Sequence, residues 1–469
     1  MRNFKEFLIA NQDKKHQLDI VSTMPQYPTG YTYLDYNTGS YTTVYSPDEQ
    51  PLYQYHNIGL PVGSVNTIIA KSQGGKSTLA LGMATSIIEP YITDWMFRWT
   101  TADVRRQIPK KLWADMSGIP MIQIADTERT HTANYAKKVA RYTNLLTEKH
   151  IVINPVTTDQ DLITMLEKHI KYKVETMQKI AMPMLDIFGR PIFEYPPTSF
   201  IVDSASQLLM EDCDDPSVAK KGGGILDIYL SSIQGTAGAR RAKIISAMYS
   251  QLVNYAKKFN IIIFMINHIN KMLPINGIQL KQYRGLKAGE TINGGERAMY
   301  LTANILRLDV IKSIGYGTST SLDLGPGITG FVAKAKWIKS KSNSKNGETQ
   351  LVYTNEAGYD PLLSSLYYGK EVGDLPQQNH QLYVPGYSKY KFNLKNFKEV
   401  FAEHPELIGA YYDAMRDDVW AKLLDDPDIA VAADAKLMNK IREDIHNDED
   451  ISRGDMNDMD DMFANMINT

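Results

Sequence analysis

The sequence predicts an α/β protein whose mostly parallel sheet is covered by helices on both faces. Two observations support this prediction. Along residues 62–360, short runs of β-branched and other apolar residues alternate with longer segments of helical spacing. The runs are also apolar at nearly every position, which is typical of parallel strands buried on both faces. Alternating strands and helices of this kind build a layered α/β domain.

The predicted elements follow one another in a regular order. The run SVNTIIA, which ends at Ala70, predicts the first strand, and KSTLALGMATSII predicts the helix after it. PMIQIAD, which ends at Asp126, predicts a second strand before the helical segment NYAKKVARYTNLL. A helix over about 240–259 precedes the strand IIIFMINH. Further strands are predicted at FIVD, ANILRLDV, GFVAKAKW and TQLVYT.

The remaining segments contain many turn-forming residues. Residues 30–60 are rich in Tyr, Thr, Pro and Gly and predict turns and short strands. Three segments predict loops: 211–238, 270–295 and the lysine- and serine-rich stretch 339–347. The inserts near 89–118 and 188–197 have no predicted role.

The length and charge of the chain suggest four parts. The 469 residues are 43% apolar, so a sizeable core can be buried. We expect an N-terminal arm over 1–29, a core over 30–375, a C-terminal helical region over 376–447 and an acidic tail over 448–469. The last 49 residues carry thirteen acidic and five basic side chains, a net charge of −8 within a chain of net charge −2. This composition is typical of a disordered tail.

The cysteine content and hydropathy indicate a compartment. The single cysteine, Cys213, excludes an internal disulfide and favours a reducing environment. Apolar runs such as IIIFMI are far too short to span a bilayer, and the first residues lack the apolar stretch of a secretory signal. We therefore expect a soluble, cytoplasmic protein, in the host cytoplasm if the source is a virus.

The most specific motif is AKSQGGKST at residues 70–78. It matches the phosphate-loop pattern G-x-x-x-x-G-K-[ST], with alanine in place of the first glycine, between a predicted strand and a predicted helix. Gly74 and Gly75 allow the backbone amides to face phosphate oxygens, and the helix N-terminus adds a positive end. We expect Lys76 to reach the β- and γ-phosphates of ATP and Ser77 to ligate Mg²⁺. The other predicted nucleotide contacts are Ser72, Gln73 and Thr78. A chance glycine–lysine turn is the alternative that this context disfavours.

Two carboxylates follow predicted strands. Asp203 ends the run SFIVD, where a carboxylate can hold the water shell of Mg²⁺. Glu128 lies two residues beyond Asp126 and can orient and deprotonate an attacking water. From the spacing alone, a helix N-cap or a solvated strand end explains each carboxylate equally well.

Taken in order, these motifs resemble the RecA-type recombinases, most closely their phage UvsX branch. The resemblance covers about Gly30–Pro361 and is carried by PTGYTYLDYNTG, AKSQGGKST, DTERTHTANYAKKV, VDSASQLL, FMINHI, GGERAMYLTANILRLD and the segment Lys339–Tyr353. The acidic tail also matches the UvsX branch, as does His268, which follows Asn267 in FMINHI. The resemblance implies a RecA-like P-loop ATPase core that binds ATP and Mg²⁺.

The resemblance also implies roles for individual residues. Glu128 matches the catalytic base, Tyr135 the aromatic side chain that stacks on adenine, and Asn267 with His268 the sensor that links nucleotide to DNA. Without the resemblance, Tyr135 would be read as a core tyrosine on a helix face, and a satisfied core histidine is the alternative for His268. The family more often has glutamine in place of His268, and a neutral histidine offers a single N–H donor, so its signalling can depend on pH or tautomer.

Lys339 and Lys341 match family lysines that cross a subunit boundary and stabilise charge at the neighbour's γ-phosphate. ATP would then lie between subunits of a head-to-tail helical filament. The N-terminal arm would help this assembly by docking Phe7 and Ala10 on the next subunit. The alternatives are an exposed turn for the lysines and a helix packed on its own core for the arm.

Single- and double-stranded DNA are the expected partners, together with ssDNA-binding and mediator proteins. Basic side chains must grip the phosphate backbone, and two loops supply them. The predicted DNA contacts are Arg240, Arg241, Lys243 and Ser246 at and just after the end of the first loop, and Lys271, Lys281, Arg284, Lys287 and Arg297 in and just after the second. An ordinary solvated charged face explains any one of these residues about as well.

These inferences predict an ATP-dependent recombination protein. It would form filaments on single-stranded DNA, catalyse homologous pairing and strand exchange, and hydrolyse ATP when bound to DNA. One alternative is a hexameric DNA helicase of the same fold. The other is a non-catalytic protein that binds or anneals single strands and uses ATP as a switch.

Overall fold

The computed structural model describes residues 26–45, 51–98, 121–140, 150–177, 179–185, 191–209, 236–271, 285–292, 295–315, 321–341 and 347–424. Phe7 and Ala10 of the predicted arm, the acidic tail and residues 99–118 of the first insert lie outside this part of the chain. The same holds for most of the first predicted loop and for Lys281 and Arg284 of the second.

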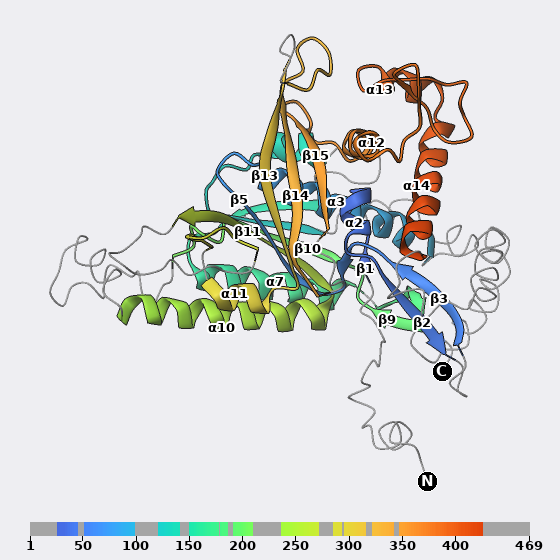
Figure 1. The fold of residues 1–469 in the computed structure, drawn as a ribbon. Helices are drawn as coiled ribbons and strands as arrows, with labels where there is room; N and C mark the ends of the chain where they lie inside the picture. The colour runs from blue at the N-terminus through green and yellow to red at the C-terminus, as the bar shows by residue number, and fades with distance from the viewer. Residues whose placement is uncertain are drawn as a thin grey trace.

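A ten-stranded sheet organises the fold, with the order β16-β15-β14-β13-β5-β11-β10-β6-β7 and with β12 paired to β11 (Figure 1). Its strands are β5 (Val65–Ala70), β6 (Ile122–Asp126), β7 (Ile151–Pro155), β10 (Thr198–Asp203), β11 (Ile261–Lys271), β12 (Glu290–Ile292), β13 (Asn304–Ile314), β14 (Gly330–Ser340), β15 (Glu348–Thr354) and β16 (Gly358–Tyr359). The strands from β13 to β7 are parallel, whereas β14, β15 and β16 pair antiparallel. The predicted α/β class with a mostly parallel sheet is confirmed, and it is compatible with a Rossmann- or RecA-like core.

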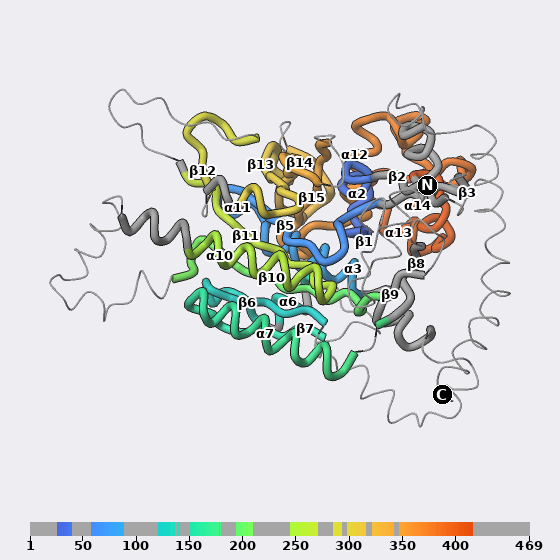
Figure 2. Tube along the Cα trace, turned by 90° about the horizontal axis from the view of Figure 1, so that it is seen from below, coloured from blue at the N-terminus to red at the C-terminus, as the bar shows by residue number. Residues whose placement is uncertain are grey.

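Helices cover both faces of this sheet. On one face lie α3 (Lys76–Arg98) and α6 (Ala133–Ala140), and on the other lie α7 (Asp159–Thr176), α10 (Thr236–Phe259) and α11 (Gly295–Leu301) (Figures 1 and 2). Neighbouring strand residues point to opposite faces. In β11, for example, Phe264 packs into the α3 core and Ile263 into the core under α7 and α10. This two-sided burial explains the continuous apolar runs in the sequence.

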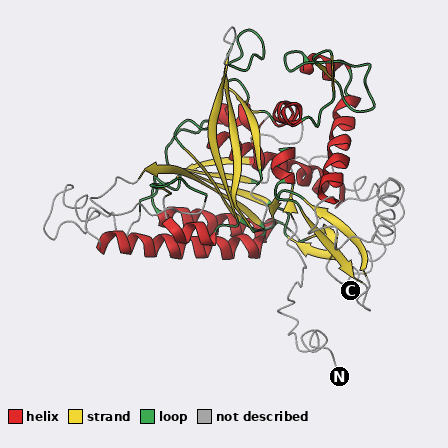
Figure 3. Ribbon diagram, in the orientation of Figure 1, coloured by secondary structure: helices red, strands yellow, loops and turns green. Residues whose placement is uncertain are grey.

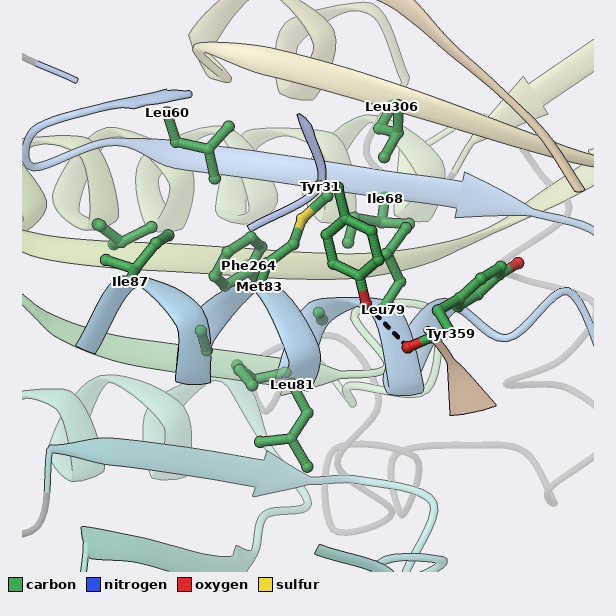
Figure 4. Close-up of a cluster of buried hydrophobic side chains, with 14 of the residues drawn as sticks. Tyr31, Leu60, Ile68, Leu79, Leu81, Met83, Ile87, Phe264, Leu306 and Tyr359 are labelled. Carbon is green, nitrogen blue, oxygen red and sulfur yellow. Dashed lines mark hydrogen bonds between the residues drawn. The ribbon is translucent and has the colours of Figure 1, made fainter. Parts of the chain in front are cut away.

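The core under α3 fixes the helix that follows β5. Leu79, Met83 and Ile87 recur every four residues, so they form one stripe of α3, and this stripe packs against Ile68 and Phe264 (Figure 4). Each of these side chains is at most 2% exposed. Burying such a side chain contributes about 1.5–3 kcal/mol, so the start of α3 is held firmly next to the end of β5.

The N-terminal segment contains more regular structure than the sequence predicted. A short helix, α2 (Thr32–Tyr36), lies where turns and strands were expected. The strands there are β1 (Gln26–Tyr27), β2 (Ser40–Tyr45), β3 (Pro51–Asn57) and β4 (Leu60–Pro61). The buried Asp35 carboxylate on α2 accepts the backbone N–H and the hydroxyl of Thr29, at 2.9 and 2.6 Å. This carboxylate therefore organises the Thr-Gly turn before the helix.

Sequence reasoning also overlooked β7 and α7. A capping box marks the start of α7: the Thr158 hydroxyl accepts the Asp161 N–H, and the Asp161 carboxylate accepts the Thr158 N–H, both at 3.1 Å. A threonine followed three residues later by an acidic residue is a sequence signal for this motif. The insert near 188–197 contributes β9 (Pro191–Glu194), which pairs with β8 (Ile180–Leu185).

Three predicted loop boundaries are wrong. Helix α10 begins at Thr236, so Arg240, Arg241 and Lys243 lie on its first turns. The second predicted loop begins too early, because β11 continues to Lys271, where it pairs with the short strand β12. Strand β14 continues to Ser340, so Lys339 is a strand residue. In each case the sheet or a packed helix extends an element beyond its strongly apolar run.

A third core lies beneath the C-terminal segment, which is mainly helical (Figure 3). The segment consists of α12 (Pro361–Val372), β17 (Gln377–Gln378), β18 (Gln381–Leu382), α13 (Phe397–Glu403) and α14 (Glu406–Leu424). Asp360 caps α12 by accepting the Leu363 N–H at 3.0 Å, and Pro361 occupies the first helical position. Among the helices described, none is sufficiently long and apolar to cross a bilayer.

Candidate functional site

The polar residues singled out in the sequence meet at the carboxyl edge of the parallel strands. In register, Ala70 at the end of β5 lies beside His268 of β11, and Asp203 at the end of β10 lies beside Asp126 of β6. In parallel α/β sheets, ligands bind in the crevice outside these strand ends. The register alone therefore gathers the predicted phosphate loop, sensor and carboxylates at one edge.

The loop from Lys71 to Gly75 connects β5 to α3 in a tightly curled conformation. Gly75 has a φ of +70°, and a Cβ on it would lie 2.7 Å from the ring of Tyr359. A Cβ on Gly74 would lie 2.8 Å from the methyl group of Ala70. Both glycines are thus required. Ala70 itself is an ordinary strand residue, so alanine at this first position of the motif introduces no strain.

Lys76 begins α3 with its amine directed toward this loop. Its Nζ donates to the carbonyl of Lys71 at 3.2 Å and lies 3.4 Å from Nδ1 of His268. Burial lowers the pKa of Lys76, while the negative charges of Asp203 and Glu128 act in the opposite direction. Within the described residues, Lys76 forms no ion pair with a carboxylate. Its charge is therefore available to an anion.

Asp126 and Glu128 differ sharply in their surroundings. Asp126 is buried, and its two carboxylate oxygens accept the backbone N–H groups of Thr130 and His131 at 3.3 and 2.8 Å. Asp126 therefore shapes the loop after β6. The Glu128 side chain is 31% exposed, and its carboxylate accepts the hydroxyl of Ser204 at 2.8 Å and lies 3.5 Å from Nε2 of His268. Of the two, Glu128 is the one placed to accept a proton from solvent.

Asp203 has a partner that the sequence reasoning missed. Oδ2 of Asp203 lies 2.6 Å from Nε2 of His131, and both side chains are at most 5% exposed. Oδ1 of Asp203 accepts no hydrogen bond from the described residues. No cluster of three ligand-type side chains occurs in the described part of the chain. A Mg²⁺ ion here would therefore rely on the Ser77 hydroxyl, Asp203 and the oxygens of a nucleotide, a donor set that suits this hard cation.

Tyr135 lies on α6 beside the same group. Its hydroxyl hydrogen-bonds that of Thr78 at 2.8 Å, and its ring meets His131 edge-on at 5.1 Å. Burial is the main cause that raises the pKa of Tyr135 to about 12. The stacking of this ring on adenine stays a prediction. The tyrosine does connect the first turn of α3 to the loop after β6.

Lys339 and Lys341 have a local partner, the C-terminal end of α11. The Lys339 ammonium donates to the carbonyls of Tyr300 and Thr302 at 2.7 and 2.6 Å and also to that of Met299. Lys341 has one long contact of 3.5 Å, to the carbonyl of Leu301. Burial and then the neighbouring Lys341 lower the pKa of Lys339 to about 8. Both cations complement the negative end of a helix.

The predicted DNA contacts are only partly described. Arg240, Arg241, Lys243 and Ser246 lie on α10, Lys271 ends β11, Lys287 is exposed just before β12, and Arg297 lies on α11. Helix α10 is followed directly by β11, which runs back along it. At 1.5 Å per helical residue and 3.3 Å per strand residue, each element is about 36 Å long. The start of α10 and the end of β11 therefore lie at the same end of the molecule (Figures 1 and 2).

Three residues that the sequence motifs did not single out contact the site: His131, Ser204 and Tyr359. His131 and Ser204 lie inside the motif strings DTERTHT and VDSAS, but the sequence did not indicate which side chains they would contact. Tyr359, whose hydroxyl donates to the Gly74 carbonyl at 2.9 Å, is 285 residues from its partner. Comparison with models of known protein families and with curated proteins finds no match for this chain.

Proposed function

We propose that this chain is an ATP-binding recombinase of the RecA type. In this proposal it assembles as a helical filament on single-stranded DNA, pairs that strand with homologous duplex DNA and hydrolyses ATP when DNA is bound. The proposal rests on the motif series in the sequence and on one geometric observation. Lys76, His268 and Glu128 form a connected row at the carboxyl edge of the parallel strands, beside the curled loop 71–75.

This row suits phosphoryl transfer to water. Lys76 offers a buried cation that no carboxylate of the described residues contacts as an ion pair, so phosphate oxygens can bind it. The amides at the start of α3 add to the positive potential. Glu128 can orient a water and accept its proton. Mg²⁺, held by Ser77 and Asp203, would neutralise charge on the β- and γ-phosphates. Similar sites occur in other ATPases of related folds, so the row by itself supports nucleotide hydrolysis.

The link to DNA comes from the position of His268. It lies on β11, and the same strand ends at Lys271, where the second predicted DNA loop begins. His268 contacts both Lys76 and Glu128, so a shift of β11 driven by DNA would move a side chain that touches both groups. This arrangement supports an ATPase that DNA controls. It gives no comparable support to a non-catalytic protein.

The test combines ATP turnover with electron microscopy. We expect single-stranded DNA to stimulate ATP hydrolysis and negative-stain images with an ATP analogue to show helical filaments. Lys76→Ala should abolish both. Lys71→Ala is the matched control, because Lys71 lies in the same loop with an exposed side chain, and this variant should retain turnover. Closed rings would indicate the helicase, and filaments without turnover the non-catalytic alternative.

A further inference from the structure

The contact between His131 and Asp203 is the strongest feature of the site that the proposed mechanism does not use. The distance of 2.6 Å between Nε2 and Oδ2 is short for a neutral hydrogen bond and typical of one that involves a charged group. Both side chains are almost completely buried, at 3% and 5% exposure. An unpaired carboxylate at this depth would be costly, so the imidazole is the group that makes a buried Asp203 tolerable.

His131 is held in place from two further directions. Its backbone N–H donates to the buried Asp126 carboxylate at 2.8 Å, which fixes the loop after β6. Its ring lies edge-on against Tyr135, and the Tyr135 hydroxyl bonds to Thr78 at the start of α3. The orientation of the imidazole is therefore fixed by contacts with β6, β10 and α6.

The geometry also specifies which oxygen of Asp203 is used. His131 contacts Oδ2, whereas Oδ1 accepts no hydrogen bond from the described residues. An ionised carboxylate can only accept, so in a pair with ionised Asp203 the donor is Nε2–H of His131. The carboxylate thus keeps one oxygen for another partner and is prevented from rotating. A fixed oxygen binds the water shell of a cation better than a mobile one, because less conformational entropy is lost.

We propose that His131 is a positioning residue that sets the affinity of the site for Mg²⁺–nucleotide by orienting the Asp203 carboxylate. This inference rests on the proposed function, since it requires that the site bind Mg²⁺ and ATP. It assigns His131 no contact with the nucleotide and no part in proton transfer. Outer partners of this kind typically change metal affinity by about 10–100-fold when they are removed.

The experiment measures binding instead of turnover. The affinity of the full chain for a fluorescent ATP analogue is measured in saturating Mg²⁺ and again in EDTA, and the ratio of the two gives the Mg²⁺-dependent gain. His131→Gln and His131→Met form a matched pair of similar length, of which only glutamine carries an N–H donor. We expect methionine to reduce the gain about tenfold and glutamine to restore most of it. The affinity in EDTA should change little in either variant.

Asp203→Asn supplies the second arm. If His131 acts through Asp203, the methionine substitution should have no further effect on the gain in the Asp203→Asn background, as in any double-mutant cycle of coupled residues. The inference would be overturned if His131→Met reduced the Mg²⁺-dependent gain by the same factor in the Asp203→Asn background as in the unmodified chain. It would also be overturned if His131→Met alone left the gain unchanged. If His131→Met does not fold, His131→Phe keeps the ring without the donor and takes its place. Loss of Mg²⁺-dependent binding in the unmodified chain would instead overturn the proposed function.

Discussion

At the scale of single residues, burial and hydrogen bonding separate side chains that look alike in the sequence. Asp126 and Glu128 are two positions apart, yet one closes a backbone turn and the other faces solvent beside His268. Lys71 and Lys76 also differ in their surroundings: the Lys71 side chain is exposed, whereas Lys76 is buried and its amine is directed toward loop 71–75. The surroundings of each side chain, and not its residue type, decide which carboxylate and which lysine can take part in chemistry.

Glu128→Gln should therefore abolish turnover without disturbing the fold. The substitution keeps the shape of the side chain and an acceptor for Ser204 but removes the base. We expect ATP hydrolysis to fall by about 10²–10⁴-fold, with nucleotide binding and thermal unfolding unchanged.

Asp126→Asn is the contrasting variant. One of its two backbone contacts would face an amide N–H₂ group, so we expect a loss of stability on the order of 1–3 kcal/mol. Thermal unfolding measures this loss. A stable Asp126→Asn protein without turnover, together with an active Glu128→Gln protein, would show that the roles are reversed.

Asp35 should make stability depend on pH. Burial raises the pKa of Asp35 from 3.8 to about 7. Below pH 4 the folded and unfolded states both hold the proton, and the contribution of Asp35 to stability is fully present. Between pH 4 and 7 the unfolded state releases its proton first, so this stability is lost as pH rises.

Asp35→Asn tests this assignment. An asparagine Oδ1 can still accept the N–H and the hydroxyl of Thr29, which both contact the same oxygen of Asp35. We expect the variant to lose a pH dependence on the order of 1–3 kcal/mol between pH 4 and 7. Urea unfolding at several pH values measures it. Parallel stability curves for the two proteins would contradict a neutral Asp35 in the folded state.

At the scale of elements, Lys339 of β14 and Lys341 just after it contact the end of α11, although the sequence predicted that both lysines act on a neighbouring subunit. Lys339 holds carbonyls at the end of α11, and α11 follows the second predicted DNA loop. An ammonium cannot bind these carbonyls and a neighbouring subunit's phosphate at once. Within the described part of the chain, the Lys341 ammonium has one contact, a long one of 3.5 Å, so it is freer than Lys339 to bind another group.

The two lysines should therefore give different phenotypes. Lys339→Met keeps the aliphatic stem but removes the cap of α11, so we expect a loss of stability on the order of 1–2 kcal/mol. Lys341→Met should leave thermal unfolding nearly unchanged. If Lys341 acts on the neighbour's ATP, the same variant should lose about a thousandfold in DNA-stimulated turnover. Full activity in Lys341→Met would assign both lysines to the fold alone.

At the scale of the whole molecule, the sequence predicted the sheet well and the side-chain partners poorly. Strands such as β5 and β11 were recognisable because two-sided burial requires an unbroken apolar run. The glycines of the predicted phosphate loop and Lys76 were found from local spacing. His131, Ser204 and the α11 carbonyls were missed as partners, because contacts across the sheet depend on strand order. Spacing along the chain does not reveal that order.

A mixing experiment tests the proposed assembly. Protein carrying Lys341→Met with an intact Glu128 is combined with protein carrying Glu128→Gln with an intact Lys341. Neither should hydrolyse ATP alone. If ATP lies between subunits, mixed filaments should regain part of the activity, because some intact Glu128 pockets then face an intact Lys341. Filaments shown by labelling to be mixed, yet inactive, would argue against action between subunits.

The hydrogen bond from Tyr359 to the Gly74 carbonyl has a consequence for synthesis of the protein. The two residues are 285 positions apart, so a ribosome adding about 5–20 residues per second needs about 15–60 s to pass from one to the other. Throughout that interval the nascent chain carries loop 71–75 without the tyrosine that holds it against β16. A nascent chain released before Tyr359 would contain the whole motif at residues 70–78, but loop 71–75 would lack the hydrogen bond that helps to fix its conformation. If loop 71–75 binds nucleotide as proposed, the ability to bind it should therefore arise late in translation.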